Sequence, residues 1–453
     1  MLPWPRAPKV LWDMTRDRPT LMSRLAGHHD AVRLPLGPQA LYYFTRPEHA
    51  QYVLARNADN YEKGIGQSHA RRALGRGLLT NEGESWRRAR SALRPAFAQE
   101  RVPQQASIID TEAVGLTSRL TGHGTGKSTP LNVQHTLIDY TLRVLGPALI
   151  GRDLMGYSEL GSAFDVVQDQ AIFEMMTLNA VPAWLPTKRQ KRFRQALGYL
   201  DQVVDDLVAT HDPVGGQDLV SLVLAQQLPE HELKRQLRDE LVTMLLAGHE
   251  TTASTLSWAV GLVGKHPHVH SRIRDEARQA LGPDPSGDSD ADKAIKALPY
   301  TAAVIHEVAR LYPAVWLLSR KALGDDTVGG YHVPAGAQVL ICPYALHRDP
   351  RYWEAPEEFN PDRFLGAFPA ESRYAYIPFG AGPRSCVGRS LGLTEAIIAL
   401  ARVCRDVDFT VDPHNGRAEG LMTLRPADPL FLNVLPPQEG NMQPAPGGRS
   451  PAF

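Results

Sequence analysis

The sequence has few cysteines, no long apolar run near its N-terminus and no excess of charge of either sign. Only three cysteines occur among 453 residues, and a disulfide framework is not expected at that density. A reducing compartment, the cytoplasm, is therefore the expected location. Basic and acidic residues both number 49, which argues against binding of the whole chain to nucleic acid or to an anionic membrane. The first twenty residues hold no apolar run long enough for a signal peptide or a membrane anchor.

Strand patterns are scarce as well, and helical periodicity prevails. Most segments between residues 100 and 315 repeat apolar residues at helical spacing, and residues 233–265 read as a single long helix. Short strands are expected near residues 31–45 and 327–343 and again near the C-terminal end. We therefore expect a mainly α fold with small β-sheets, in the α+β class.

The chain shows no internal repeat and no clear linker between residues 20 and 435. Residues 436–453 are rich in proline and glycine, a composition that predicts disorder. We expect one domain over residues 21–435, with residues 1–20 as an N-terminal lead segment and residues 436–453 as a disordered tail.

Polar residues interrupt the middle of the long expected helix, in "LLAGHETTAS" (245–254). The zinc peptidase pattern H-E-x-x-H does not explain them, because its second histidine is Ala253 here. A second tempting motif, "GHGTGKST" (122–129), fails as a phosphate-binding loop, because Thr121 replaces the first glycine. The interruption needs another explanation.

Cys386 stands in a glycine-rich stretch, "FGAGPRSCVG" (379–388), that precedes an apolar helical pattern. Loop N–H groups, the positive end of a helix and a nearby arginine all favour a thiolate. Cys342 and Cys404 lie in apolar strand-like and helical contexts, which are typical of inert buried cysteines. Cys386 is therefore the candidate reactive thiol.

The stretch matches F-x-x-G-x-R-x-C-x-G at every fixed position: Phe379, Gly382, Arg384, Cys386 and Gly388. It resembles the haem-ligand loop of the cytochrome P-450 family of haem-thiolate monooxygenases. The resemblance implies that Cys386 binds the iron of haem b and that Arg384 pairs with a haem propionate. It also implies a single-domain fold, with the haem between a long distal helix and the helix that follows the cysteine loop.

Other positions match further motifs of the same family. Trp86 and Arg90 form W-x-x-x-R, whose side chains bond a haem propionate in the family, and Arg320 occupies a further propionate-pairing position. On a helix, Trp86 and Arg90 share one face.

A third motif lies in "HEVAR" (306–310), where Glu307 and Arg310 share a helix face. By resemblance, Arg363 in "FNPDRF" completes a structural Glu-Arg-Arg network with them. Asp362 stands where the family motif usually has a glutamate, and the arginine of the motif, Arg363, is present.

The interruption in the long helix, "AGHETT" (247–252), now matches the family's A/G-G-x-D/E-T segment. Two of its residues would lie against the haem and the oxygen: Ala247 and Gly248. By resemblance, Glu250 and Thr251 are the catalytic acid–alcohol pair, which relays and positions protons. We expect Thr252 to bond to a carbonyl one turn earlier and His249 to pack away from the haem.

Positions that line the substrate pocket in relatives are mostly apolar here: Leu78, Phe173, Met176, Leu246, Val315, Trp316, Leu317 and Met422. Apolar residues of this kind also fit an ordinary core. Together they favour a lipophilic substrate, such as a terpenoid, a fatty acyl group or a polyketide-like molecule.

Fewer than seventy residues follow Cys386, so no fused reductase is expected. The resemblance implies a monomer that uses O2 and takes electrons from a separate ferredoxin with its NAD(P)H-dependent reductase. We expect Arg87 and Arg88, which point away from the haem side of their helix, to dock the acidic ferredoxin; a plain solvated face is the alternative. Two other functions stay open: a peroxide-driven peroxygenase or haem-thiolate isomerase, and a non-catalytic haem-binding sensor.

Overall fold

We describe a computed structural model of the chain, which covers residues 17–36, 39–124, 131–177, 180–211, 216–226, 228–281, 291–366, 370–412 and 416–435. The expected tail and nearly all of the expected lead segment lie outside these residues. Helix α2 (Arg18–His28) starts inside that lead segment and buries Leu21 and Met22. The Asp17 side chain caps it by accepting the N–H of Thr20 at 3.1 Å. The folded part therefore begins before residue 21.

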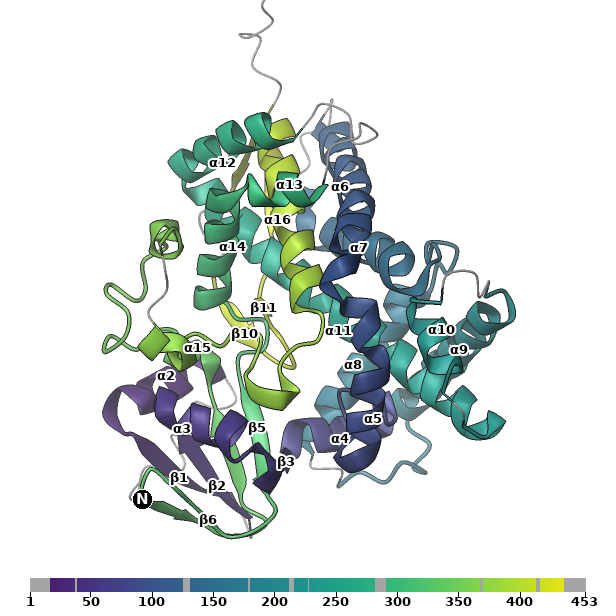
Figure 1. The fold of residues 1–453 in the computed structure, drawn as a ribbon, viewed down its shortest axis with the longest axis vertical. Coiled ribbons are helices and arrows are strands. Elements are labelled where there is room, and N and C mark those ends of the chain that lie inside the picture. The colour runs from purple at the N-terminus through teal and green to yellow at the C-terminus, as the bar shows by residue number, and fades with distance from the viewer. Residues whose placement is uncertain are drawn as a thin grey trace, which may run out of the picture.

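Helices make up most of the described chain (Figure 1). They are α4 (Ile65–Leu74), α5 (Gly83–Leu93), α6 (Val102–Gly124), α7 (Val133–Leu145), α8 (Leu160–Met176), α9 (Lys188–Ala209), α10 (Leu219–Leu224), α11 (Glu230–Lys265), α12 (Pro267–Ala280), α13 (Ala291–Lys296), α14 (Pro299–Leu311) and α16 (Arg389–Asp406), with the short α3 (Pro47–Gln51) and α15 (Pro343–Leu346). Helix α11 is 36 residues long. It confirms the single long helix that the sequence predicts over residues 233–265.

The strands form small sheets, as expected. The largest has five strands in the order β1 (Ala31–Leu36), β2 (Gln39–Phe44), β8 (Gln338–Ile341), β5 (Leu318–Ala322) and β3 (Tyr61–Lys63). Only the β2–β8 pair of this sheet is parallel. The others are β6 (Asp326–Val328) with β7 (Tyr331–Val333), β10 (Ala418–Gly420) with β11 (Leu424–Pro426), and β4 (Leu131–Asn132) with β12 (Phe431–Val434) and β9 (Phe409–Val411). The mainly α fold with small sheets is confirmed.

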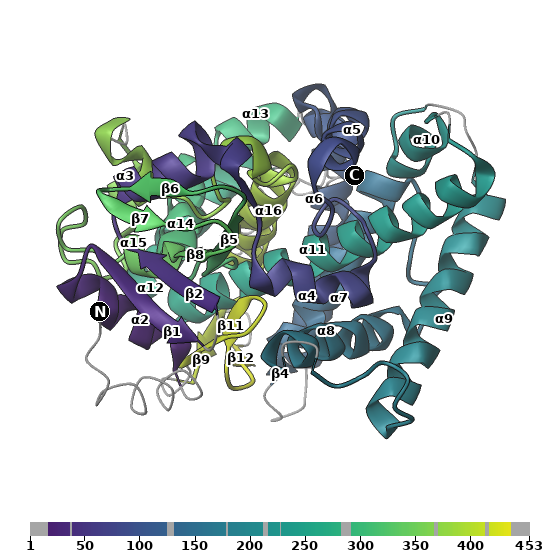
Figure 2. The ribbon, with the colours of Figure 1, turned by 90° about the horizontal axis from the view of Figure 1, so that it is seen from below.

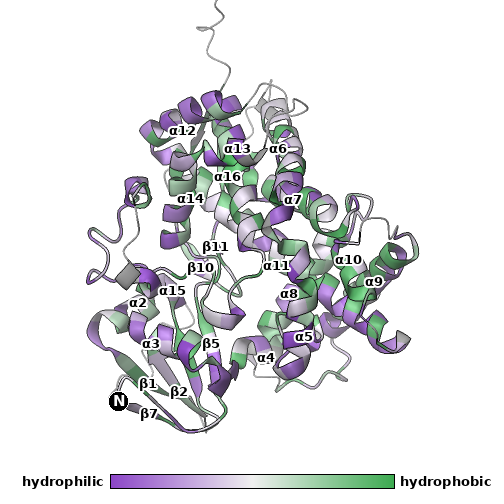
Figure 3. Ribbon diagram, viewed as in Figure 1, coloured by the Kyte–Doolittle hydropathy of each residue, from purple (hydrophilic) through white to green (hydrophobic). Residues whose placement is uncertain are grey.

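Helix α11 runs through the middle of the molecule, between the sheet at one end and α9 at the other (Figure 2). It packs against α7, α14 and α16, and the apolar residues of its second half, from Ala253 on, share one large cluster with buried residues of those three helices. Hydrophobic segments predominate in the middle of α16, whereas the peripheral α12 is largely hydrophilic (Figure 3). Within the described ranges, none of the helices combines the length and the apolar character that crossing a membrane requires. The centre of the fold is therefore where α11 passes α16.

Candidate active site

The glycine-rich loop before α16 takes a shape that only glycine allows. Gly380 and Gly382 have φ angles of +67° and +71°, in the left-handed region that disfavours other residues. A Cβ atom on Gly382 would lie 1.8 Å from the carbonyl oxygen of Leu54. The N–H of Cys386 closes the loop by donating to the carbonyl of Phe379 at 2.9 Å. The loop thus presents Cys386 just before α16 begins.

Cys386 differs from the other two cysteines in its surroundings. Its side chain is exposed, whereas Cys342 and Cys404 are buried. Burial raises the pKa of the Cys342 thiol to about 12 and raises the pKa of Cys404 as well. Solvent reaches Cys386, yet the protein around it is dense enough to raise its thiol pKa, while the N–H of Gly388 and the charge of Arg90 act in the opposite direction. A bound metal cation would favour the thiolate further.

Helix α5 contacts the cysteine loop directly. Arg90 donates from Nη2 to the carbonyl of Ser385 at 2.9 Å. The guanidinium groups of Arg90 and Arg384 lie 5.7 and 5.2 Å from the ring of Trp86, which is 6% exposed. The residues of W-x-x-x-R and the arginine of the cysteine loop therefore form one cluster.

Three cations gather beside this cluster with little negative charge to balance them. Arg384 pairs with Glu82 at 2.9 Å, and its Nε has no hydrogen-bond partner among the described residues. Burial, with the charge of Arg384, lowers the pKa of Arg320 to about 10. Burial lowers the pKa of Lys63 to about 7, and the charges of Arg384 and Arg320 act in the same direction. Two further carboxylates would balance these charges, so the residues fit the two propionates of a haem.

Lys63 belongs to none of the sequence motifs, yet it is part of this site. It lies on β3, two residues after Tyr61, and both side chains are buried on the same face of the strand. Its Nζ donates to the carbonyls of Leu78 and Asn81 at 2.8 and 2.6 Å. The signal in the sequence was the spacing of Tyr61 and Lys63, since residues two apart in a strand lie on the same face.

The polar interruption of α11 exposes one of its faces. Ala247 is exposed, although Leu245 and Leu246 before it are buried. A Cβ on Gly248 would lie 2.8 Å from Cδ1 of Leu145. This glycine therefore lets α7 pack closely against α11. Its expected place against the haem and the oxygen stays a prediction.

The acid and the alcohol of this segment make separate contacts. Oγ1 of Thr251 donates to the carbonyl of Ala247 at 2.7 Å. Oε1 of Glu250 accepts from Oγ1 of Thr423 at 2.6 Å and also from Nε2 of Gln168. The two catalytic candidates are thus neighbours in sequence, and each is fixed by a different element.

The prediction that Thr252 bonds to the carbonyl one turn earlier is wrong. Thr251 makes that kind of bond instead, while the Thr252 side chain is buried near Gly392 of α16. His249 packs away from the exposed face, as expected. Its Nδ1 lies 2.8 Å from the carbonyl oxygen of Leu245, its ring lies 5.3 Å from that of Phe164, and burial lowers its pKa.

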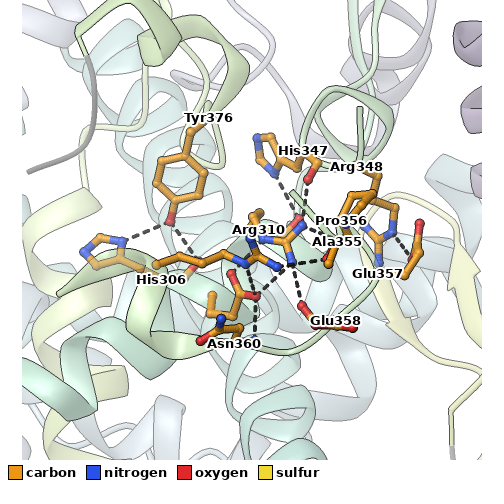
Figure 4. Close-up of polar contacts among 12 residues, drawn as sticks. His306, Arg310, His347, Arg348, Ala355, Pro356, Glu357, Glu358, Asn360 and Tyr376 are labelled. Atoms are coloured by element: carbon orange, nitrogen blue, oxygen red, sulfur yellow. Dashed lines mark hydrogen bonds and ion pairs between the residues drawn. The ribbon is translucent and has the colours of Figure 1, made fainter. Parts of the chain in front are cut away.

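Glu307 and Arg310 form a fully buried, two-bonded ion pair, with N–O distances of 2.7 and 2.8 Å. Nε of Arg363 lies 3.4 Å from Oε1 of Glu307. Arg310 also donates to three carbonyls, those of His347, Pro356 and Glu358 (Figure 4). The pair therefore ties α14 to the irregular segment that leads to the cysteine loop, and removing one partner would cost about 3–5 kcal/mol.

The apolar pocket candidates do not gather in one cluster. Leu78 and Leu246 belong to one apolar cluster, against which Met422 packs. Val315 packs against a second cluster, and Leu317 packs against a third that includes Trp316. Trp316 has a structural contact, since its Nε1 donates to the carbonyl of Leu421 at 3.0 Å. Phe173 stacks under Arg189, whose Cζ lies 4.6 Å from the ring. The side chain of Met176 lies outside the described residues.

The docking candidates Arg87 and Arg88 are both exposed on α5. Arg87 lies 3.2 Å from Asp59 and 3.6 Å from Glu84. Arg88 lines a groove of about 740 Å³ between α5 and the start of α11. Since Arg90 of the same helix bonds the cysteine loop, this exposed face is next to the candidate site. Among the described residues, no group of three His, Cys, Asp or Glu side chains is arranged to hold a metal ion.

The molecule combines four features of a haem-thiolate oxygenase. They are the fold, the cysteine loop, the cation cluster of Lys63, Arg90, Arg320 and Arg384, and the polar interruption of α11. The family model for cytochrome P450 matches residues 2–434, and the chain belongs to this family. It is a cytochrome P450 monooxygenase, and membership implies a haem-iron cofactor.

Relatives in sequence and in structure agree with this assignment. Cyclooctatin synthase of Streptomyces melanosporofaciens is 34% identical over 400 residues, covering 86% of this chain and 85% of its own. Cyclooctat-9-en-7-ol 5-monooxygenase of the same organism is 32% identical over 391 residues, covering 84% and 83%. The crystal structure of a 6-coordinated cytochrome P450 from Thermus thermophilus superposes with a TM-score of 0.72 at 28% identity, covering 92% of this chain and 98% of its own.

Proposed function

We propose that this chain binds haem b through Cys386 and inserts one atom of O2 into a lipophilic molecule of the terpenoid class. The observation that carries this proposal is the exposed thiol of Cys386 beside three cations, of which Arg384 forms an ion pair with Glu82, while Lys63 and Arg320 have their pKa lowered by burial and by neighbouring cations. When bound, the haem supplies the activation of O2. The residues of the chain hold the cofactor and handle protons.

Three arginines would hold the propionates: Arg90, Arg320 and Arg384. A propionate would stabilise the charge of Arg320, which burial and the neighbouring Arg384 disfavour. It would also give Nε of Arg384 a hydrogen-bond partner, which it lacks among the described residues. Phe379, Gly382 and Gly388 give the loop the shape that presents Cys386. Ala247 and Gly248 would lie on the opposite side, where α11 exposes one face.

Thr251 would position a water molecule. Its hydroxyl proton is engaged by the carbonyl of Ala247, so the lone pairs of Oγ1 are left to accept from water on the exposed face of α11. Glu250, the residue just before Thr251 on α11, would supply the protons that this water passes on.

The terpenoid class rests on two relatives whose names refer to cyclooctatin and cyclooctat-9-en-7-ol. The apolar cluster that holds Leu78, Leu246 and Met422 supports a lipophilic substrate. Phe173, Val315 and Leu317 would extend this lining. We propose a cytoplasmic monomer that takes electrons from an acidic ferredoxin docked on Arg87 and Arg88.

Spectroscopy and turnover of the purified protein test the proposal. We expect the wild type to bind one haem and the reduced protein to give the carbon monoxide spectrum of a thiolate ligand. Cys386→Ser should lose that spectrum, whereas Cys342→Ser should keep it. The opposite pattern would assign the ligand to another cysteine.

The reaction type is tested by the source of oxidising power. NAD(P)H, O2 and a surrogate ferredoxin should oxygenate cyclooctat-9-en-7-ol or a related terpenoid. In Thr251→Ala, most of the electrons from NAD(P)H should instead reduce O2 to hydrogen peroxide. Product formed with hydrogen peroxide but not with the ferredoxin would indicate a peroxygenase. Haem binding with neither reaction would indicate a sensor.

A further inference from the structure

Both described hydrogen bonds to the carboxylate of Glu250 end on one of its two oxygens. Oγ1 of Thr423 lies 2.6 Å from Oε1, and Nε2 of Gln168 donates to the same atom. The hydrogen bonds of the described residues place no donor on Oε2. Glu250 itself is only partly buried, whereas Thr423 and Gln168 are 5% and 8% exposed. The two oxygens of this carboxylate therefore differ in their surroundings.

The two donors belong to elements that are anchored independently of Glu250. Gln168 lies on α8, and Thr423 precedes β11, whose first residue, Leu424, is held on both sides of its peptide. The N–H of Leu424 donates to the carbonyl of Ala314 at 2.9 Å, and its carbonyl accepts from Oγ of Ser254 at 2.7 Å. Ser254 is one turn further along α11 than Glu250. The hydroxyl of Thr423 is thus held at a fixed place relative to α11.

We propose that Thr423 and Gln168 are positioning residues that fix Oε1 of Glu250 as a permanent acceptor and leave Oε2 to move protons. An oxygen that already accepts two strong bonds is a poor site for a further proton, whereas a free carboxylate oxygen takes one readily. A proton from water binds Oε2 and then passes to a water on the Thr251 side, so Glu250 returns to its starting state. This inference rests on the role proposed for Glu250 above.

His249 does not take part in this path. Its Nδ1 is engaged by the carbonyl of Leu245, and its ring packs beside Phe164. Thr251 is likewise held by Ala247. Among the described contacts of residues 247–252, the side-chain hydrogen bonds that come from side chains outside α11 are those to Glu250.

An infrared measurement tests the geometry without any turnover. The difference between resting wild type and Glu250→Gln isolates the carboxylate stretch of Glu250. We expect this band to shift in Thr423→Val and in Gln168→Leu and to return in Thr423→Ser, which restores the hydroxyl. Thr117→Val is the matched control, because Thr117 is also 5% exposed and bonds a carbonyl within α6, at 2.9 Å. An unshifted band in Thr423→Val and Gln168→Leu would overturn the proposal.

A second measurement follows proton delivery with O2 as the only probe. In air, NAD(P)H, O2 and one proton give hydrogen peroxide and NAD(P)⁺, with electrons delivered through a surrogate ferredoxin. We expect Thr423→Val and Gln168→Leu to slow this reaction about 3- to 10-fold and to change its solvent deuterium effect, a part of the ~10²–10⁴ that a positioned acid or base supplies. Thr423→Ser and Thr117→Val should keep the wild-type rate.

Glu250→Gln distinguishes the proposed role of Glu250 from the positioning roles of Thr423 and Gln168. A wild-type rate in Glu250→Gln would overturn the proposed role of Glu250 and this inference with it. A slow Glu250→Gln together with a fast Thr423→Val and Gln168→Leu would overturn the inference alone.

Discussion

At the scale of single residues, Gly380 and Gly382 show how strictly the cysteine loop requires glycine. Gly382 has no room for a Cβ, because the Leu54 carbonyl oxygen would lie 1.8 Å from it. Gly380 also has a positive φ, but a Cβ there would meet nothing closer than 3.9 Å. The same loop thus contains one glycine required by conformation and one required by conformation and space.

This contrast predicts different costs for two alanine substitutions. Gly380→Ala should lower stability by about 1–2 kcal/mol, the cost of a left-handed alanine. Gly382→Ala adds a backbone clash, so the loop should shift and the haem content should fall well below that of Gly380→Ala. Haem content and the midpoint of thermal unfolding of both variants, expressed in parallel, check this. Equal haem loading in the two would contradict it.

For Glu395 on α16, the surroundings constrain the charge of the side chain rather than its shape. It is buried, its Oε1 has no hydrogen-bond partner among the described residues, and burial raises its pKa well above the ordinary value. The folded protein therefore keeps the proton, while the unfolded chain releases it above pH of about 4.3. Stability is then lost as pH rises from that value toward the folded pKa, by ~1.4 kcal/mol per pH unit.

Glu395→Gln is predicted to remove this dependence, because an amide does not titrate. The substituted protein should gain stability relative to wild type as pH rises from 5 to 8, whatever its offset at pH 5. Thermal midpoints at several pH values measure the slope. Parallel curves for the two proteins would show that Glu395 ionises in the folded state.

At the scale of elements, the segment between α4 and α5 is held from both sides. The N–H of Leu78 donates to Oε2 of Glu240 on α11, and its carbonyl accepts from Lys63 on β3, both at 2.8 Å. A Cβ on Gly77 would lie 2.2 Å from Oγ1 of Thr243. This segment carries Leu78, so contacts from α11 and β3 fix where a proposed pocket residue lies.

Glu240→Ala should release this segment and weaken substrate binding more than haem binding. The lost bond leaves the N–H of Leu78 without its partner, at a cost of about 1–3 kcal/mol. Spin-state titrations with a diterpene should show a dissociation constant raised at least several-fold, at normal haem content. Glu232→Ala is the control, because Glu232 is exposed on the same helix. Identical titrations for both variants would contradict the assignment.

At the scale of the whole molecule, local patterns predicted more than distant ones. The spacing of Glu307 and Arg310 and the glycines around Cys386 could be read locally, because each motif acts within one turn or one loop. The role of Lys63 could not be read from the sequence, since strand parity with Tyr61 indicates at most that its side chain is buried and its relation to Arg320 and Arg384 exists only after folding. The hydroxyl that bonds back within α11 was misassigned between Thr251 and Thr252, because both have a carbonyl one turn earlier and only neighbouring helices decide. Pocket and core residues share one composition, which is why the apolar candidates divided among three clusters.

Electron supply is a property of the molecular surface, and it predicts a salt effect. Arg88→Glu should slow ferredoxin-supported turnover several-fold at low salt and leave the diterpene titration unchanged. The difference should shrink as ionic strength rises, because screening removes the attraction that the wild type gains. Lys234→Glu, on the exposed surface of α11, is the comparison. The same loss in both would point to net charge rather than to a docking site.

The distribution of the site along the chain also has a consequence in time. The ribosome makes Trp86 and Arg90 early, and Cys386 only about 300 residues later, which takes about 15–60 s at ~5–20 residues per second. The cation cluster also needs Arg320 and Arg384, so a nascent chain holds half of it while translation continues. Haem capture by Cys386 therefore cannot precede the synthesis of the whole cluster. A chain released between Arg384 and Cys386 would have the arginines for the propionates but no thiol for the iron, and it should leave the ribosome as colourless protein.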